Sequence, residues 1–172
     1  MALTRLNNRS VSGVTALPSG VTLPDDTIMP SGSILQVVFS PTTGVPATSS
    51  TSWATLLSLS ITPLYSNSKI LIMANPNSLY VGGGAVTNQF SSWRISRDGS
   101  QISGTNTNFH AEIGRNMTYG TRQLPEMKWI DNANTTSQIV YTVQAMITLN
   151  GGSLVLNDTA GTSTVIAMEI AG

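Results

Sequence analysis

Residues 137–149, SQIVYTVQAMITL, decide the fold class of this chain. Apolar side chains occupy alternate positions from Ile139 to Leu149, and the positions between them are mostly polar. A period of two is the pattern of a β-strand with one buried face, because successive side chains point to opposite sides of a sheet. The eleven residues of this alternation would extend roughly 36 Å, which is long for one strand.

Shorter runs of the same character lie between turn formers along the rest of the chain. Residues 69–75, KILIMAN, are apolar on both faces, as expected for a strand that is covered on two sides. Asp98-Gly99 between two such runs predicts a hairpin. The runs that predict strands are 34–40, 55–62, 69–75, 89–97, 100–103, 126–130, 137–149, 154–156 and 163–171.

No segment sustains the 3.6-residue pattern of an amphipathic helix over three turns, and there is neither a heptad pattern nor a repeat of 20–50 residues. We therefore expect an all-β domain over residues 34–172. The architecture favoured is a two-sheet antiparallel sandwich that is jelly-roll-like, with a closed barrel as the alternative.

Residues 1–33 differ in character from the rest, because prolines and glycines there exclude a helix or a central strand. They predict either a flexible tail or, as we prefer, an extended arm that lies on a neighbouring subunit. The arm interpretation depends on apolar residues that are too many for a solvated tail. These are Leu3, Leu6, Val11, Val14, Leu17, Val21, Leu23 and Ile28.

Charge is scarce: 9% of the 172 residues are charged, and eight basic residues balance eight acidic ones. A nucleic-acid partner is not expected, because such proteins use many cations to displace counterions from phosphates. No cysteine is present, which excludes disulfides and thiolate chemistry. The charge-free stretches are broken by polar residues, glycine or proline, so we expect no membrane-spanning segment and no membrane partner.

The sequence predicts no enzyme, no metal site and no cofactor. His110 is the only histidine, and Glu112 would share its face of a strand, so the two could act as a base and its orienting carboxylate. No serine lies in a G-x-S-x-G elbow, and the acidic residues lack ligand spacing, although Asp25-Asp26 could bind calcium. Residues 82–84 are three glycines without the Lys-Ser or Lys-Thr of a phosphate-binding loop.

Arginines and aromatic residues occur together in the middle of the chain. Arginine beside aromatic side chains is typical of surfaces that contact sugars or proteins. We expect inter-subunit or core packing here, with a carbohydrate site as the alternative. The candidate surface residues are Trp93, Arg94, Arg97, His110, Arg115, Tyr119 and Trp129.

The mismatch between polarity and charge indicates a homo-oligomer. A monomer of this size usually depends on charged side chains for solubility and protects its sheet edges with lysine. This chain has two lysines, Lys69 and Lys128, on strands rich in serine and threonine. Hydroxyl groups can hydrogen-bond across a contact without the desolvation cost of ions.

Three stretches carry a resemblance when they are taken together: residues 31–38 (SGSILQVV), 57–74 (LSLSITPLYSNSKILIMA) and 166–171 (IAMEIA). They resemble small β-structured virion proteins of tailed bacteriophages, as in capsid decoration proteins and tail-fibre tip modules. The resemblance covers roughly residues 34–172. It implies a trimer, a jelly-roll-like fold and a structural or adhesive role, with no catalytic residues to carry over.

These observations predict a non-enzymatic structural protein of a tailed-phage virion, made in the host cytoplasm. It would be an accessory surface subunit, either a capsid decoration (cement) protein or a tail-associated part, that docks onto other virion proteins through its N-terminal arm. The alternative is a receptor-binding adhesin that recognises a host glycan through residues 93–129. A hydrolase acting on host polysaccharide, with His110 and Glu112, is a third hypothesis.

Overall fold

The computed structural model describes residues 31–82, 89–102, 109–113, 121–147, 152–157 and 161–172, so the predicted arm lies almost entirely outside the described residues. Every regular element within these ranges is a β-strand. The strands are β1 (Ile34–Thr42), β2 (Ala47–Thr48), β3 (Ala54–Ile61), β4 (Lys69–Asn75), β5 (Ser78–Gly82), β6 (Gln89–Arg97), β7 (Ser100–Gln101), β8 (Phe109–Ile113), β9 (Thr121–Gln123), β10 (Met127–Asn132), β11 (Ile139–Ile147), β12 (Gly152–Leu156) and β13 (Ser163–Ile170).

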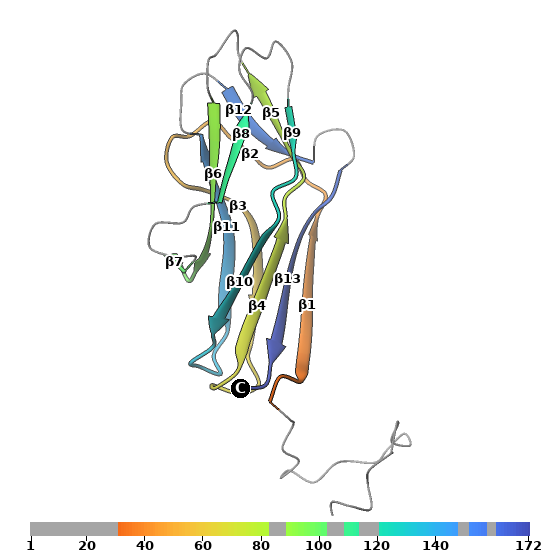
Figure 1. Ribbon diagram of the computed structural model, residues 1–172, viewed down its shortest axis with the longest axis vertical. Coiled ribbons are helices and arrows are strands. Elements are labelled where there is room, and N and C mark those ends of the chain that lie inside the picture. The colour runs from red at the N-terminus through yellow and green to blue at the C-terminus, as the bar shows by residue number, and fades with distance from the viewer. Residues whose placement is uncertain (1–30, 83–88, 103–108, 114–120, 148–151, 158–160) are drawn as a thin grey trace, which may run out of the picture.

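Two antiparallel sheets form the body of the molecule (Figure 1). The first sheet has the order β1-β13-β4-β10. The second sheet has the order β3-β11-β6-β7, and β8 also pairs with β6. The Asp98-Gly99 turn joins β6 to β7 with both residues at positive φ, 48° and 86°, as a type I′ hairpin requires.

A third sheet, with the order β2-β12-β5-β9, continues the first. The strands of the third sheet have the same spatial order as those of the first sheet to which they are connected along the chain. The connections are β1 to β2, β12 to β13, β4 to β5 and β9 to β10. Three of the four breaks contain a proline, namely Pro46, Pro76 and Pro125. Proline has no N–H to donate to the ladder, which accounts for the interruption of these three strands.

Asn157 connects the segments that meet at this break. It is 2% exposed and has a φ of 57°, a left-handed conformation that asparagine tolerates. Its Nδ2 donates to the carbonyl oxygens of Thr42 and Gly44 at 2.7 Å each, and its Oδ1 accepts from Ser163 Oγ at 2.8 Å. The break is therefore a fixed bend.

The topology is a jelly roll. When each broken strand is counted once, with β7 and β8 as two pieces of the strand that pairs with β6, the chain has eight strands in the orders 1-8-3-6 and 2-7-4-5. Two facing sheets of this connectivity are the two Greek keys of that fold. The expectation of an antiparallel, jelly-roll-like sandwich is confirmed.

The core lies between the first and second sheets. Alternate residues of β11, from Ile139 to Ile147, are at most 1% exposed, which confirms the alternation predicted for this strand. They face Ile70, Ile72 and Ala74 of β4, which belong to the same buried cluster. Burial of these side chains stabilises the fold by about 25 cal/mol for each Å² of apolar surface removed from water.

Candidate interaction surface

The outward side of the first sheet is apolar across all four strands. The register aligns Val37, Met168, Leu71 and Ile130 in one row. The next row holds Phe39, Ile166, Met73 and Lys128, and the row on the other side begins with Ile34 and Ile170. Because each row crosses the full sheet, the apolar side chains form one continuous surface.

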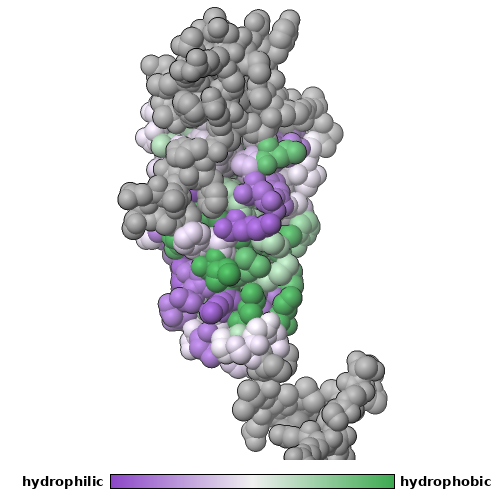
Figure 2. All heavy atoms as spheres, viewed as in Figure 1, coloured by the Kyte–Doolittle hydropathy of each residue, from purple (hydrophilic) through white to green (hydrophobic). Residues whose placement is uncertain are grey.

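We call this surface the apolar face. Its residues are Ile34, Val37, Phe39, Leu71, Met73, Ile130, Ile166, Met168 and Ile170. The four on the edge strands β1 and β10 are 55–58% exposed, and the five on the central strands are half-buried. Figure 2, in the view of Figure 1, shows apolar side chains gathered over the lower part of the molecule, where β10, β4, β13 and β1 lie.

Charged groups lie only around the margin of the apolar face. Lys69 begins β4, and Lys128 near the start of β10 pairs with Glu126 at 2.7 Å, with both side chains exposed. The outward positions of these four strands, all within the described ranges, hold no aspartate or glutamate. Strand β4 was predicted to be covered on both sides; the second sheet covers one side, while Leu71 and Met73 on the other are half-exposed.

The outward side of the second sheet is polar instead. It presents Thr55, Ser58 and Ser60 of β3 and Thr142 and Gln144 of β11. The two outer faces of the sandwich therefore differ in kind: one is apolar and the other is rich in hydroxyl and amide groups.

Arg94 lies on this polar side and contacts Trp53. Its guanidinium carbon is 4.4 Å from the centroid of the indole ring, which is a cation–π distance. Arg94 Nε donates to Gln144 Oε1 at 2.7 Å, and its Nη1 lies 3.4 Å from Gln101 Oε1. Partial burial lowers the pKa of Arg94 from its ordinary value.

The other described candidates from the sequence lie elsewhere. Trp93 is fully buried, and its Nε1 donates to Ser91 Oγ at 3.0 Å, so it belongs to the core. Trp129 is half-buried and packs against the same core. The structure thus does not bring Trp93, Arg94 and Trp129 to one surface.

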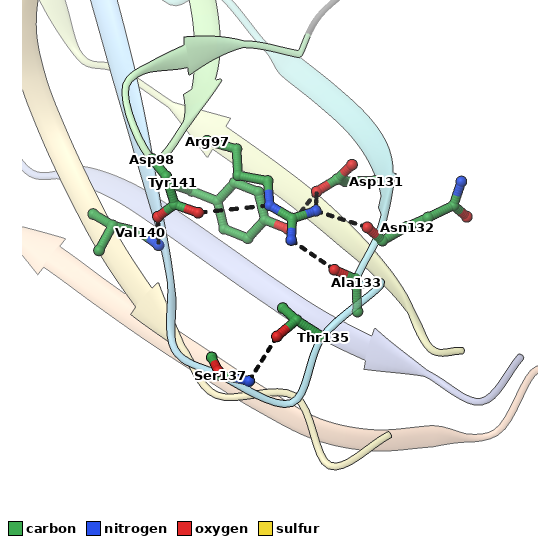
Figure 3. Close-up of polar contacts among 9 residues, drawn as sticks. All are labelled: Arg97, Asp98, Asp131, Asn132, Ala133, Thr135, Ser137, Val140 and Tyr141. Carbon is green, nitrogen blue, oxygen red and sulfur yellow. Dashed lines mark hydrogen bonds and ion pairs between the residues drawn. The ribbon is translucent and has the colours of Figure 1, made fainter. Parts of the chain in front are cut away.

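Arg97 is the centre of a polar network at one end of the sandwich (Figure 3). Its Nη1 donates to Asp131 Oδ2 at 2.9 Å and to the carbonyl oxygen of Asn132 at 2.8 Å, and its Nη2 donates to the carbonyl oxygen of Ala133 at 2.6 Å. The Tyr141 hydroxyl donates to the same Asp131 oxygen at 2.8 Å. These bonds join β6 and β11 of the second sheet to β10 of the first.

The network also fixes the protonation of Tyr141. Burial, together with the hydrogen bond to Asp131 and the charge of that carboxylate, raises the pKa of Tyr141 far above its ordinary value. The hydroxyl therefore remains a donor, and the guanidinium of Arg97 has its donors engaged by the protein itself. This arrangement suits cross-linking of the two sheets better than ligand binding.

Glu169 holds together the three stretches of sequence that carry the resemblance. Its carboxylate accepts from the backbone N–H of Leu64 at 2.8 and 3.0 Å, from that of Tyr65 at 3.1 Å and from Gln36 Nε2 at 2.6 Å. Gln36 comes from SGSILQVV, Leu64 and Tyr65 from the SITP…SNSKILI stretch, and Glu169 from IAMEIA. The three stretches of this chain thus meet at one internal turn.

The Glu169 carboxylate is fully buried and has no cationic partner among the hydrogen-bond donors around it. Burial alone would raise its pKa, but the surrounding donors outweigh burial and hold the pKa of Glu169 below its ordinary value. Ser68 Oγ adds to this lowering, although it does not reach the geometry of a full hydrogen bond.

The side chains of the remaining candidates from the sequence lie outside the described part of the chain. His110 and Glu112 lie on β8, whose side chains are outside the described part, and their backbone pairs with Ser92 and Phe90 of β6. Arg115 and Tyr119 lie outside the described residues. The arm residues Leu3, Leu6, Val11, Val14 and Leu17 do as well, and so do Asp25 and Asp26.

In the described ranges, no three histidine or acidic side chains lie close enough to hold a metal ion. The same part of the chain contains no helix that could cross a membrane.

No protein-family model matches the chain, and no curated protein is detectably similar to it. Among solved structures, the VP2 subviral particle of infectious bursal disease virus aligns with 91% of this chain and 43% of the VP2 chain, at 13% identity and a TM-score of 0.41. A viral particle of the same virus aligns with 91% and 40% of the two chains, at 15% identity and a TM-score of 0.44. This chain therefore spans about two-fifths of the length of those proteins. A TM-score of this size carries no argument about function.

Proposed function

We propose that this chain is a non-enzymatic structural protein of a tailed-phage virion, an accessory subunit on the particle surface that works as a symmetric homo-oligomer. The observation that carries the proposal is the apolar face, which spans all four strands of the first sheet. The largest apolar patch of a soluble monomer is typically about 300–600 Å² and often functional. A face built of nine apolar side chains is suited to a protein that remains assembled.

The chemistry of the rest of the surface supports the same role. With 9% charged residues, the chain has few groups for electrostatic steering or for general acid–base work. Arg97, Asp131 and Glu169 are all engaged in internal bonds. These three charged groups, of which Arg97 was a candidate site residue, are thus used to hold the fold.

The jelly roll alone leaves function open, since viral coat proteins, lectins and cupins all use it. The assignment to a phage particle depends on the resemblance of the stretches that meet at Glu169. A trimer follows from that resemblance as well. The physical argument from the apolar face supports assembly without fixing the number of subunits.

In this proposal, the N-terminal arm attaches the subunit to another virion protein. The chain enters the sheet beside its own C-terminal end, because Gly32 N donates to Ala171 O at 2.9 Å and Ala171 N to Ser33 O at 2.8 Å. Attachment would thus start at the lower end of the first sheet. The apolar arm residues would supply contact area on the partner, where binding of the folded form adds stability.

The copy number of the protein in purified particles tests the function. Quantitative mass spectrometry should find hundreds of copies per particle for a capsid decoration subunit and a handful for a tail part. Absence from particles of the virus that encodes it would overturn the proposal.

A matched pair of variants tests the arm. Replacing Leu3, Leu6, Val11, Val14 and Leu17 by serine should leave the folded oligomer intact and abolish its incorporation into particles. The control replaces Ser10, Ser12 and Thr15 by alanine and should incorporate normally. Normal incorporation of the serine variant would refute the role of the arm.

A receptor-binding adhesin is the second candidate, and the Arg94–Trp53 contact favours it. Guanidinium, amide and aromatic groups on the polar side of the second sheet could hydrogen-bond and stack a host glycan. Glycan-array binding that is lost in Arg94→Ala, in a protein of low copy number, would support this role. An array without signal would exclude it for the glycans tested.

A further inference from the structure

We infer that the apolar face is the contact through which two copies of this chain pack against each other, first sheet against first sheet, as a two-fold pair rather than the trimer that the resemblance implies. The inference rests on the proposed structural role and names the partner of the face as a second copy. Three observations support it: the size of the face, its composition and the distribution of exposure across its strands.

The size suits a sheet-on-sheet contact. Four strands spaced about 4.8 Å apart cover roughly 19 Å, and eight residues at about 3.3 Å each extend roughly 26 Å. The flat footprint of the whole outer side of the sheet, polar margin included, is therefore roughly 500 Å² on each copy, or about 1,000 Å² for a pair, before the corrugation of side chains adds to it. A specific interface needs to exceed about 1,000 Å² in total.

The composition is complementary to itself. The outward positions of the four strands, all described, hold no carboxylate, and the two lysines lie at the margin. The centre of the face therefore carries no charge that would attract a partner of opposite charge. An identical apolar surface can pack against it without burying an ion at the centre. A polar margin borders the apolar centre at both ends of the strands and along β10, as is usual for a protein interface, and it consists of Lys69, the Lys128–Glu126 pair, Asn75, Asn132 and Thr164.

The most exposed apolar side chains of the face lie where a second copy would bury them. Side chains on the central strands β13 and β4 shelter one another and are half-buried, but Val37, Phe39 and Ile130 on the edge strands remain 55–58% exposed. Two such faces pack about 10 Å apart when their side chains interdigitate. That contact would cover the exposed edge residues together with the centre.

The first experiment measures the mass of the full chain by sedimentation velocity over a range of concentrations. The wild type should be an oligomer, and Phe39→Lys combined with Ile130→Lys should raise its dissociation constant roughly 100- to 1,000-fold, because each lysine would be buried without a partner. Ser58→Lys adds a charge at an exposed position of the opposite outer face and should leave the dissociation constant unchanged.

The second experiment does not depend on charged variants folding. The chain has no cysteine, so Val37→Cys and Ser58→Cys each introduce a single thiol, one on each outer face. At concentrations where the protein is an oligomer, maleimide should modify the thiol of Val37→Cys at least about tenfold more slowly than that of Ser58→Cys. Dilution to the monomer should remove the difference.

Three results would overturn the inference. The first is a wild type that stays monomeric at all concentrations with a reactive thiol at position 37. The second is a monomer in which that thiol is protected, which would mean that the chain's own N-terminal segment covers the face. The third is an oligomer that is insensitive to Phe39→Lys with Ile130→Lys, which would locate the contact elsewhere. A monomeric wild type would also remove the homo-oligomer from the proposed function, whereas the place of the protein on the particle is tested separately by its copy number.

Discussion

The buried carboxylate of Glu169 accepts two hydrogen bonds from the backbone N–H of Leu64, at 2.8 and 3.0 Å, across 105 positions of the sequence. One side chain on β13 thereby fixes the turn between β3 and β4, and through Gln36 it also holds β1. A charge that is buried without a cation is stable only when donors surround it. Glu169 is therefore a structural residue, and its removal should lower the stability of the whole fold.

Glu169→Gln should lower the free energy of unfolding by about 2–4 kcal/mol, because the amide accepts less strongly and turns its own N–H₂ toward the donors of Leu64 and Tyr65. Urea denaturation at fixed protein concentration measures the change. Glu126→Gln is the matched control, since Glu126 is an exposed carboxylate, and it should change stability by less than about 0.5 kcal/mol. Equal effects of the two variants would contradict the structural role of Glu169.

The same carboxylate predicts how stability depends on pH. The folded-state pKa of Glu169 lies below its unfolded value. Its contribution is thus fully present above the unfolded pKa, about 4.3, and is lost as the pH falls through the folded pKa. The stability difference between wild type and Glu169→Gln should be constant from pH 7 to about 5 and shrink below about 4. Unfolding curves at these pH values measure it, and a difference that grows in acid would contradict the account.

Arg97→Met should destabilise the fold by about 3 kcal/mol. Methionine preserves the aliphatic stem but leaves the half-buried carboxylate of Asp131 without its cation and two carbonyl oxygens without a donor. Arg94→Met is the control three positions earlier, where the guanidinium lies over Trp53 on the outer face, and it should lose about 1 kcal/mol or less. Thermal and urea unfolding of the two variants check the ranking.

Asn157→Gly separates the side chain of Asn157 from its backbone conformation. Glycine tolerates the positive φ but loses the bonds to Thr42, Gly44 and Ser163, so the variant should lose about 2–4 kcal/mol. Asn134, with a φ of 53°, is exposed, and Asn134→Gly should be close to neutral. A neutral Asn157→Gly would show that the bend is held by other contacts.

Local patterns predicted most strands of the fold but missed β2, β5, β8 and β9. The alternation of β11, the Asp98-Gly99 turn and the runs at β1, β3, β4, β6 and β13 are all found. Short strands such as β2 and β9 have too few residues to show a period. The common level of the breaks at Pro46, Pro76 and Pro125 was not predicted, because it depends on the pairing of strands far apart in sequence.

Site residues were harder to predict, because periodicity does not tell which face of a strand is inward. Arg94 and Arg97 differ by three positions and therefore lie on opposite faces of β6, one over Trp53 and the other in the network with Asp131. Trp53 was not singled out, since only the fold brings it beside Arg94. The clearest signal was the doubly apolar run at 69–75, whose second face is the centre of the apolar face.

The break that the four strands share divides this side of the sandwich into two sheets, each with its own register. One consists of β1, β13, β4 and β10, and the other of β2, β12, β5 and β9. The ladder stops where Pro76 and Pro125 interrupt it, but bonds of Asn157 and Asn77 bridge the break, because Asn157 N donates to Asn77 O at 2.8 Å and Asn77 N to Ser163 Oγ at 2.9 Å. A change of register in one of the two sheets is therefore expected to reach the other through these bonds.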